Sequence, residues 1–119
     1  MANPNIINAT AMYGKTAILA VTTTPTDIVS NTAASNKLLK VSSLIVANKN
    51  GSSSADITGS IYRGSVEYEF AYTIVVPPDA TVVLISKDSP IYLEEGDSIR
   101  LTAYVDGSLM AICSYEEIS

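Results

Sequence analysis

The sequence predicts an all-β fold, a single-domain antiparallel β-sandwich that is jelly-roll-like and has eight to ten short strands. Three observations favour this class. Ile and Val outnumber Leu and there are 7 Tyr, and β-branched and aromatic side chains fit a pleated sheet. Alternating apolar and polar positions recur between turn-forming residues, and no segment of helix length carries a helical repeat. A length of 119 residues suits one domain with one core.

The chain is divided into an extended N-terminal arm, residues 1–13, and a sandwich, residues 14–119. Within and just after the arm, residues 6–12 and 16–23 alternate like strands and flank a turn at residues 13–15, Tyr-Gly-Lys. Proline then interrupts the alternation, because it lacks the N–H that a ladder needs.

The next strands are predicted with less ambiguity. Residues 26–30 form a short strand, and residues 37–48 form a long one with Leu39, Val41 and Ile45 on one face. Leu44 and Val46 place apolar groups on the other face too, as in a strand that is covered on both sides. Apolar surface on both faces is more than a small sandwich covers, and it predicts a homo-oligomer, specifically a homotrimer.

The clearest alternation lies in residues 66–74, after a strand at residues 55–62 and an Arg-Gly-Ser turn. Five residues of this segment share one face and are expected to point into the core: Val66, Tyr68, Phe70, Tyr72 and Ile74. Three other tyrosines fall at positions of opposite parity and are predicted to be exposed or interfacial: Tyr62, Tyr92 and Tyr104.

The last strands are short and separated by turn chemistry. A Pro-Pro-Asp stretch ends the long strand, and strands follow at residues 81–86, 91–93 and 98–105. Asp106-Gly107 predicts a two-residue type I′ hairpin into a final strand, residues 108–115.

Composition argues against most enzyme classes. The chain has no His and a single Cys, Cys113, so Ser-His-Asp and Cys-His nucleophile systems, zinc sites of the Cys/His type and a disulfide within the chain are all excluded. The net charge of −5 argues against nucleic acid or an anionic membrane as a partner, because both select Lys and Arg clusters. We therefore expect no catalytic activity, no cofactor and no bound metal.

Three local patterns suggest chemistry only weakly. Gly14-Lys15-Thr16 resembles the end of a phosphate-binding loop, but Ala9 stands where that motif needs a glycine. The acidic turn Glu94, Glu95 and Asp97 either ligates Ca²⁺ or, as we favour, faces water. Glu67 and Glu69 lie on one strand face, where a solvated surface is a better interpretation than an acid/base pair. Cys113 is expected to be a buried, unreactive thiol.

Several segments together resemble a known class of protein. They are residues 2–6 (ANPNI), 13–16 (YGKT), 44–48 (LIVAN), 76–81 (VPPDAT), 91–99 (IYLEEGDSI) and 113–119 (CSYEEIS). The chain resembles the small virion structural proteins of tailed phages that infect cyanobacteria and other marine bacteria. The resemblance implies a particle component without catalytic residues. In addition, residues 93–99 are similar to the LxxGDxI strand-turn-strand pattern of many jelly rolls.

The function expected from this resemblance is that of a non-enzymatic phage virion protein, a capsid decoration or cement protein on the assembled head surface. It would be made in the host cytoplasm, because the N-terminus lacks a signal peptide, and would reside in the virion. Its partner would be the major capsid protein or another virion protein. The alternative is a head-fibre, collar or tail-tip module that contacts a host receptor or glycan.

Partner binding is assigned to the arm, because an extended apolar segment can add a strand to the sheet of another protein. The candidate residues are Asn3, Pro4, Ile6, Ile7 and Tyr13.

Overall fold

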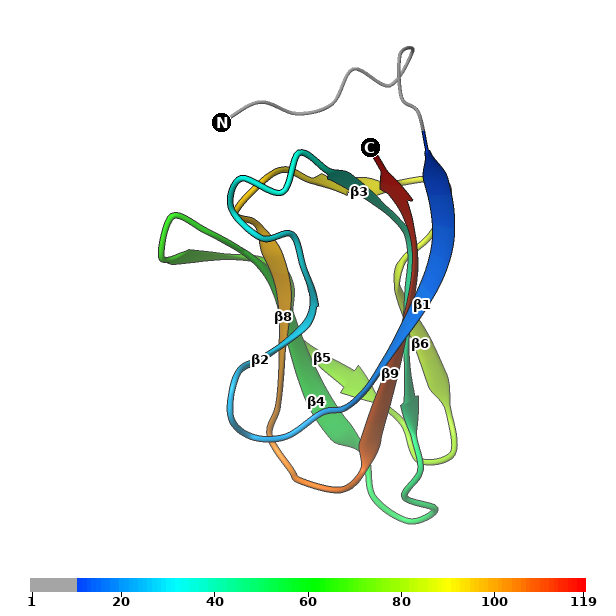
Figure 1. The fold of residues 1–119 in the computed structure, drawn as a ribbon. Coiled ribbons are helices and arrows are strands. Elements are labelled where there is room, and N and C mark those ends of the chain that lie inside the picture. Colours follow the sequence, from blue (N-terminus) through cyan, green and yellow to red (C-terminus); the bar gives the residue numbers. More distant parts are fainter. Residues whose placement is uncertain (1–10) are drawn as a thin grey trace.

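The computed structural model describes residues 11–119, which form nine β-strands and no helix. The strands are packed as two antiparallel sheets (Figure 1), so the predicted all-β sandwich is confirmed. Their bounds are β1 (Met12–Ala20), β2 (Thr26–Ser30), β3 (Leu38–Asn48), β4 (Ala55–Arg63), β5 (Val66–Val76), β6 (Thr81–Ile85), β7 (Ile91–Leu93), β8 (Ser98–Ala103) and β9 (Leu109–Ile118).

The order of strands is that of a jelly roll. The first sheet, sheet A, has the order β1-β9-β3-β6, and sheet B has the order β2-β8-β4-β5. The short strand β7 also pairs with β3, beyond the end of β6. β6 and β7 therefore act as one interrupted strand, and the sandwich has two sheets of four strand positions each.

The core lies between the two sheets and is built from the inward-facing residues of both. Its largest fully buried members include Leu44 of β3, Ile57 of β4, Leu101 of β8 and Cys113 of β9. Both sheets thus bury one face against the other, which is the arrangement that stabilises a sandwich of this size.

The N-terminal segment differs from the expectation in one respect. The predicted turn at Tyr13-Gly14-Lys15 is wrong, because these residues lie inside β1 and pair with β9 in unbroken register. A glycine flanked by polar residues looks like a turn in sequence, whereas nine consecutive pairs with β9 hold it extended. Met12 and Tyr13, at the end of the predicted arm, belong to this strand; Asn3, Pro4, Ile6 and Ile7 lie outside the described residues.

In β3, the predicted strict alternation is wrong, because the register with β9 shifts between Val41 and Ser43. This bulge changes which parity faces the core: Leu39 and Val41 are buried before it, and Leu44 and Val46 after it. Ile45 and Ala47 therefore lie on the outer face of sheet A.

In β5, the predicted core face is also wrong. Tyr68 and Tyr72 are exposed, and only Phe70 of the five predicted residues packs against the core. The register with β4 shifts on either side of Gly59, so β5 carries two extra residues in the region of Tyr72. Tyr68 lies outside this region and pairs with Ile61 toward the end of the β4–β5 hairpin, where its side chain is exposed. Of the tyrosines predicted to be exposed, Tyr92 and Tyr104 are exposed.

The predicted type I′ hairpin turn at Asp106-Gly107 is wrong. β8 belongs to sheet B and β9 to sheet A, so Asp106-Gly107 lies in a connection between the two sheets. It does not form the turn of a hairpin. Gly107 has a positive φ of 83°, and Asp106 does not share it. The two-residue turn with positive φ at both positions is Gly64-Ser65, between β4 and β5.

Gly59 gives a direct test of this packing. A Cβ at that position would lie 2.9 Å from Phe70 Cζ and 3.3 Å from Leu101 Cδ2, so Gly59→Ala should destabilise the fold by about 1–3 kcal/mol through overpacking. Gly14→Ala is the matched control, because nothing lies within 4 Å of its Cβ position. Urea unfolding of both variants measures the difference, and equal midpoints would show that Phe70 does not lie over Gly59.

Candidate functional site

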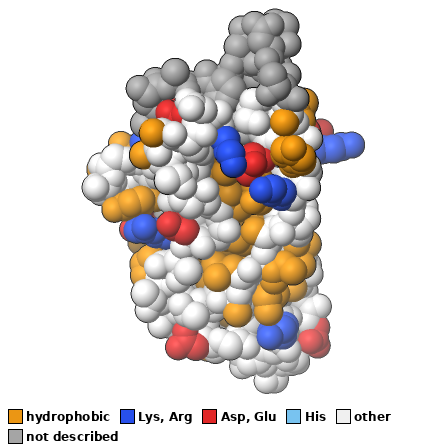
Figure 2. All heavy atoms as spheres, viewed as in Figure 1, with side chains coloured by type: hydrophobic (Ala, Val, Ile, Leu, Met, Phe, Trp, Pro, Cys, Tyr) orange, Lys and Arg blue, Asp and Glu red, His pale blue; other side chains and the backbone are white. Residues whose placement is uncertain are grey.

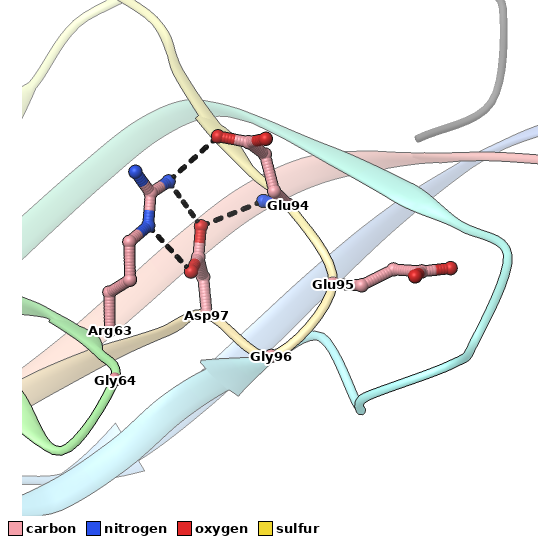
Figure 3. Close-up of a pocket in the computed structure, with 6 residues that line it drawn as sticks. All are labelled: Arg63, Gly64, Glu94, Glu95, Gly96 and Asp97. Carbon is pink, nitrogen blue, oxygen red and sulfur yellow. Dashed lines mark hydrogen bonds and ion pairs between the residues drawn. The ribbon is translucent and has the colours of Figure 1, made fainter. Parts of the chain in front are cut away.

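The acidic turn between β7 and β8 is organised around Arg63, the last residue of β4. Arg63 Nε donates a hydrogen bond to Asp97 Oδ1 at 2.8 Å, and Nη2 donates to Asp97 Oδ2 and, at 2.9 Å, to Glu94 Oε2 (Figure 3). The Asp97 side chain is 2% exposed and that of Arg63 is 51% exposed. The hydrogen bond to Asp97 is the main cause that raises the pKa of the Arg63 guanidinium. The guanidinium therefore stays charged and joins the β4–β5 hairpin to the turn.

The remaining contacts of this turn are also structural. The Glu94 N–H donates to Asp97 Oδ2, and the Asp97 N–H donates to the Glu94 carbonyl, while Gly96 has a φ of 89°. Glu95 is buried and its Oε2 accepts the Asn36 N–H at 2.6 Å. These bonds define a tight turn in which glycine supplies the positive φ.

The turn therefore does not form the calcium site that we considered from sequence. The Arg63 guanidinium occupies the position beside Asp97 and Glu94 that a cation would take. Across residues 11–119, no group of three or more His, Cys, Asp or Glu is arranged to hold a metal ion. The preferred alternative, a turn that faces water, is wrong for Glu95 and Asp97, which are buried.

The other polar candidates are likewise engaged or inert. Glu67 Oε1 accepts a hydrogen bond from Ser60 Oγ at 3.1 Å. Burial raises the pKa of the Cys113 thiol to about 12, so it is a protonated core residue, as predicted.

The two sheets differ in their outer faces. On sheet B the outer face is polar and includes one ion pair: Arg100 Nε donates to Asp27 Oδ1 at 3.1 Å, and the guanidinium carbon lies 3.7 Å from the centroid of the Tyr62 ring. A face of this kind is suited to water.

On sheet A the outer face is apolar at its centre. The register places Ile18 of β1 beside Ile112 of β9, Ile112 beside Ile45 of β3, and Ile45 beside Val83 of β6. Ile18 and Val83 are 69% and 57% exposed. Residues that alternate with them, such as Leu19, pack against the core, so these four side chains form one row across the outside of the sheet.

The rows on either side carry no charge either. We call the three rows the uncharged face; its residues are Thr16, Ile18, Ala20, Ser43, Ile45, Ala47, Thr81, Val83, Met110, Ile112 and Ser114. None of these residues is buried. Four strands about 4.8 Å apart and five residues of about 3.4 Å give an area of about 300 Å². Figure 2 looks onto the edge of the sandwich where β1 and β2 lie in front, so the outer face of sheet A is seen there only in profile, at the right.

An outer sheet face with three Ile and one Val in a row is unusual for a surface that only meets water, because exposed faces of antiparallel sheets are normally polar. The largest apolar patch on a typical monomer has a comparable area and is often functional. The uncharged face is therefore the best candidate for the functional surface in the described part of the chain.

One end of sheet A carries a separate ionic cluster. Glu117 of β9 binds Lys15 Nζ at 3.0 Å and Lys37 Nζ at 3.1 Å. The hydrogen bonds from Lys15 and Lys37 hold the pKa of the Glu117 carboxyl below its usual value. The cluster ties β1, β9 and the residue before β3 together at one end of sheet A, on the side of the sheet opposite to the uncharged face.

Of the residues that the sequence assigned to partner binding, the structure describes Tyr13, which is 58% exposed on β1. It lies toward the ionic end of sheet A and outside the uncharged face. The uncharged face is not predicted by the sequence, although apolar groups on both sides of residues 37–48 are one signal of it.

Comparison with known proteins supports the fold of the chain and no more. No protein-family model matches the chain, and no curated protein matches it. A solved structure from work titled "Bacillus endospore appendages form a novel family of disulfide-linked pili" is similar at a TM-score of 0.55 and 12% identity. The match covers 100% of this chain and 96% of that one, and it supports the sandwich architecture. In the described residues, no helix has the length and apolar character to span a membrane.

The Arg63–Asp97 contact should contribute measurably to stability. Asp97→Asn leaves the guanidinium without its charged partner and should lower the free energy of unfolding by about 1–3 kcal/mol. Glu94→Gln, on the exposed side of the same guanidinium, should change it by less than about 0.5 kcal/mol. Chemical denaturation of the two variants provides the measurement, and a loss from Glu94→Gln as large as that from Asp97→Asn would contradict the ranking.

The Glu117 cluster should make stability depend on acid. Because the folded-state pKa of Glu117 is lowered, its contribution is complete above the usual glutamate pKa of 4.5 and is lost as the pH falls through the folded-state value. The stability difference between the wild type and Glu117→Gln should therefore be constant near neutral pH and shrink below about pH 4.5. Urea midpoints across this range test it; a difference that grows on acidification has the wrong sign.

Proposed function

We propose that this protein is a non-enzymatic structural component of a phage particle, a decoration or cement protein that attaches to the assembled head through the uncharged face of sheet A. The observation that carries the proposal is the row Ile18–Ile112–Ile45–Val83, which no other described element covers. That the partner surface belongs to a phage particle is inferred from the resemblance of the sequence to small virion proteins.

The chemistry of the uncharged face suits attachment to a larger protein surface. Burial of about 300 Å² of mostly apolar surface contributes up to about 7 kcal/mol before the costs of association. A free energy of this size gives only weak binding to a single free partner. It is adequate for attachment to a repeating surface that offers many sites. A protein that binds the assembled shell and not its separated subunits stabilises the shell by linkage.

Attachment and assembly would be non-covalent. The similar pilus structure is described as disulfide-linked, but here Cys113 is the only cysteine and is buried in the core. One thiol can join chains only in pairs, so a disulfide-linked polymer is not available to this sequence. The arm residues Asn3, Pro4, Ile6 and Ile7 remain candidates for a second contact by strand addition.

A pair of matched variants tests the attachment face. Val83→Lys places a charge at the margin of the uncharged face, and Val75→Lys does the same on β5 of sheet B, where the valine is 55% exposed against 57% for Val83. Val83→Lys should weaken binding to particles roughly tenfold or more, because it buries an unpaired charge. Val75→Lys should bind normally. Copies per particle after re-decoration of depleted particles are the measurement.

The second readout is the melting of the particles, with genome release followed by a DNA dye. Particles decorated with the wild type or Val75→Lys should release DNA at a higher temperature than depleted particles or those offered Val83→Lys. Equal melting temperatures for complete and depleted particles would overturn the cement function.

The alternative, a fibre, collar or tail-tip module that binds a receptor or glycan, is favoured by the exposed tyrosines of β5, Tyr68 and Tyr72. Tyrosine rings on a surface are suited to stacking and to hydrogen bonding through one polar tip. Under this alternative, particles with Tyr72→Ala should melt normally and adsorb poorly to cells.

A further inference from the structure

The four edges of the two sheets are not equally protected. An open strand edge invites pairing with another chain, and proteins blunt such edges with bulges, short strands or charge. In sheet B, β5 has two register shifts and a positive φ of 52° at Thr73, and β2 has five residues and one register shift. In sheet A, β6 also has five residues and one register shift.

The edge formed by β1 is neither short nor bulged. Its nine residues pair with β9 from Met12↔Ile118 to Ala20↔Met110 without a bulge, and the strand contains no proline. Its one charge, Lys15, is bound to Glu117. Among the described residues, no other strand pairs with its outer side. β1 is therefore a long, regular and open edge.

The hydrogen-bonding groups on this edge can be assigned. Ala11 and Ser119 exchange both backbone hydrogen bonds, and the Val21 N–H donates to the Leu109 carbonyl. Hydrogen-bonded pairs alternate in an antiparallel ladder, so odd-numbered residues of β1 bond to β9. The even-numbered residues direct their N–H and C=O groups away from the sheet, and they are Met12, Gly14, Thr16, Ile18 and Ala20.

Gly14 is the second observation. It lies inside a regular strand, where glycine lowers stability, and a Cβ there would meet nothing within 4 Å. Nothing within the described chain requires a glycine at this position. A glycine in a strand often marks the close approach of another backbone or side chain.

We propose that β1 pairs with β1 of a second copy, antiparallel about a twofold axis at Thr16, so that the two A sheets become one continuous sheet. The axis follows from the strand itself, because Thr16 is the midpoint of Met12–Ala20 and only this register uses all nine residues. In this register each even-numbered residue pairs with an even-numbered residue of the second copy, so the outward-directed N–H and C=O groups of the two strands face one another. The five such residues of each copy make about ten hydrogen bonds in total.

Side-chain sizes are complementary in this register. The exposed Ile18 lies opposite Gly14 of the second copy, where there is no side chain to meet it. Tyr13 lies opposite Leu19, Met12 opposite Ala20, and Lys15 opposite Ala17, so the two lysines are not placed directly opposite one another. Cross-strand pairs of this kind stabilise a ladder, whereas like charges directly opposite destabilise it.

The size of the contact predicts a weak dimer. A strand of nine residues is about 30 Å long and a sheet with its side chains about 10 Å thick, so the edge buries about 600 Å² in total. Stable interfaces bury at least about 1,000 Å². The dimer should therefore form at high local concentration, such as on a repeating surface. It carries both uncharged faces on one side of the continuous sheet, which permits bivalent attachment.

This pairing is an alternative to the trimer expected from the sequence, because a contact between the same strand in two copies closes after two subunits.

Disulfide trapping tests the register. Residues in a hydrogen-bonded antiparallel pair have Cα atoms about 5.5 Å apart, within the range of a disulfide, so Thr16→Cys should cross-link to a dimer under mild oxidation. Ile18→Cys is the control, because the two Ile18 residues are offset by four positions along the strands. Cys113 is buried and does not compete. Cross-linking of Thr16→Cys should be at least about tenfold faster than that of Ile18→Cys.

The proline variant tests the hydrogen bonds. Thr16→Pro removes an N–H that points away from β9, so the fold should persist, as judged by circular dichroism, while the concentration-dependent dimer is lost in sedimentation equilibrium. Thr16→Val retains the N–H and should dimerise like the wild type.

The proposal is wrong if the wild type is monomeric at every accessible concentration, if it is trimeric, or if the two cysteine variants cross-link at equal rates. All these measurements use the isolated protein, so their outcome is separate from binding to particles. Val83→Lys, on the opposite edge of sheet A, can lose particle binding and still dimerise.

Discussion

The pairing of β9 with both β1 and β3 is the interaction on which the rest of the structure depends. The last strand of the chain inserts between two strands from its first half, and it pairs with β1 over nine residues and with β3 over ten. Sheet A cannot close until the C-terminal residues are in place. Such long-range pairing carries a large loop-closure cost and is typical of slowly folding all-β domains.

The same pairing creates both surfaces to which we assign a role. Because β9 supplies Met110, Ile112 and Ser114 to the outside of the sheet, it joins the apolar residues of β1 to those of β3. It also leaves the other side of β1 open. Sheet B differs in both respects: its outer face carries charged side chains, and its edge strands are short or bulged. The molecule thus has one side that is suited to water and one that is suited to other protein surfaces.

The Arg63–Asp97 contact shows how a strongly charged, concave feature can be structural. Its ionic groups are matched to one another and to backbone N–H groups within the β4–β5 hairpin and the β7–β8 turn. Every buried polar side-chain atom in residues 11–119 has a hydrogen-bond partner. A buried polar group without a partner would indicate a ligand site. Since the described residues contain no such group, the apolar side of sheet A is the better candidate for a binding surface.

The sequence by itself determined the fold class and most strand positions, because alternation and turn residues act locally. Residues 91–93, 26–30 and 55–62 were placed within one residue of the observed strands. It also determined that Cys113 is buried, from its apolar strand context. Tertiary structure decided the rest.

The errors have one physical origin: a bulge or a change of partner strand alters the faces without leaving a mark in the local pattern. One inserted residue in β3 turned Ile45 outward, and two in β5 left Tyr72 exposed. The row Ile18–Ile112–Ile45–Val83 comes from four strands far apart in the chain. Only the register between strands brings those residues together, because register is set by long-range hydrogen bonds and core packing that no single segment encodes.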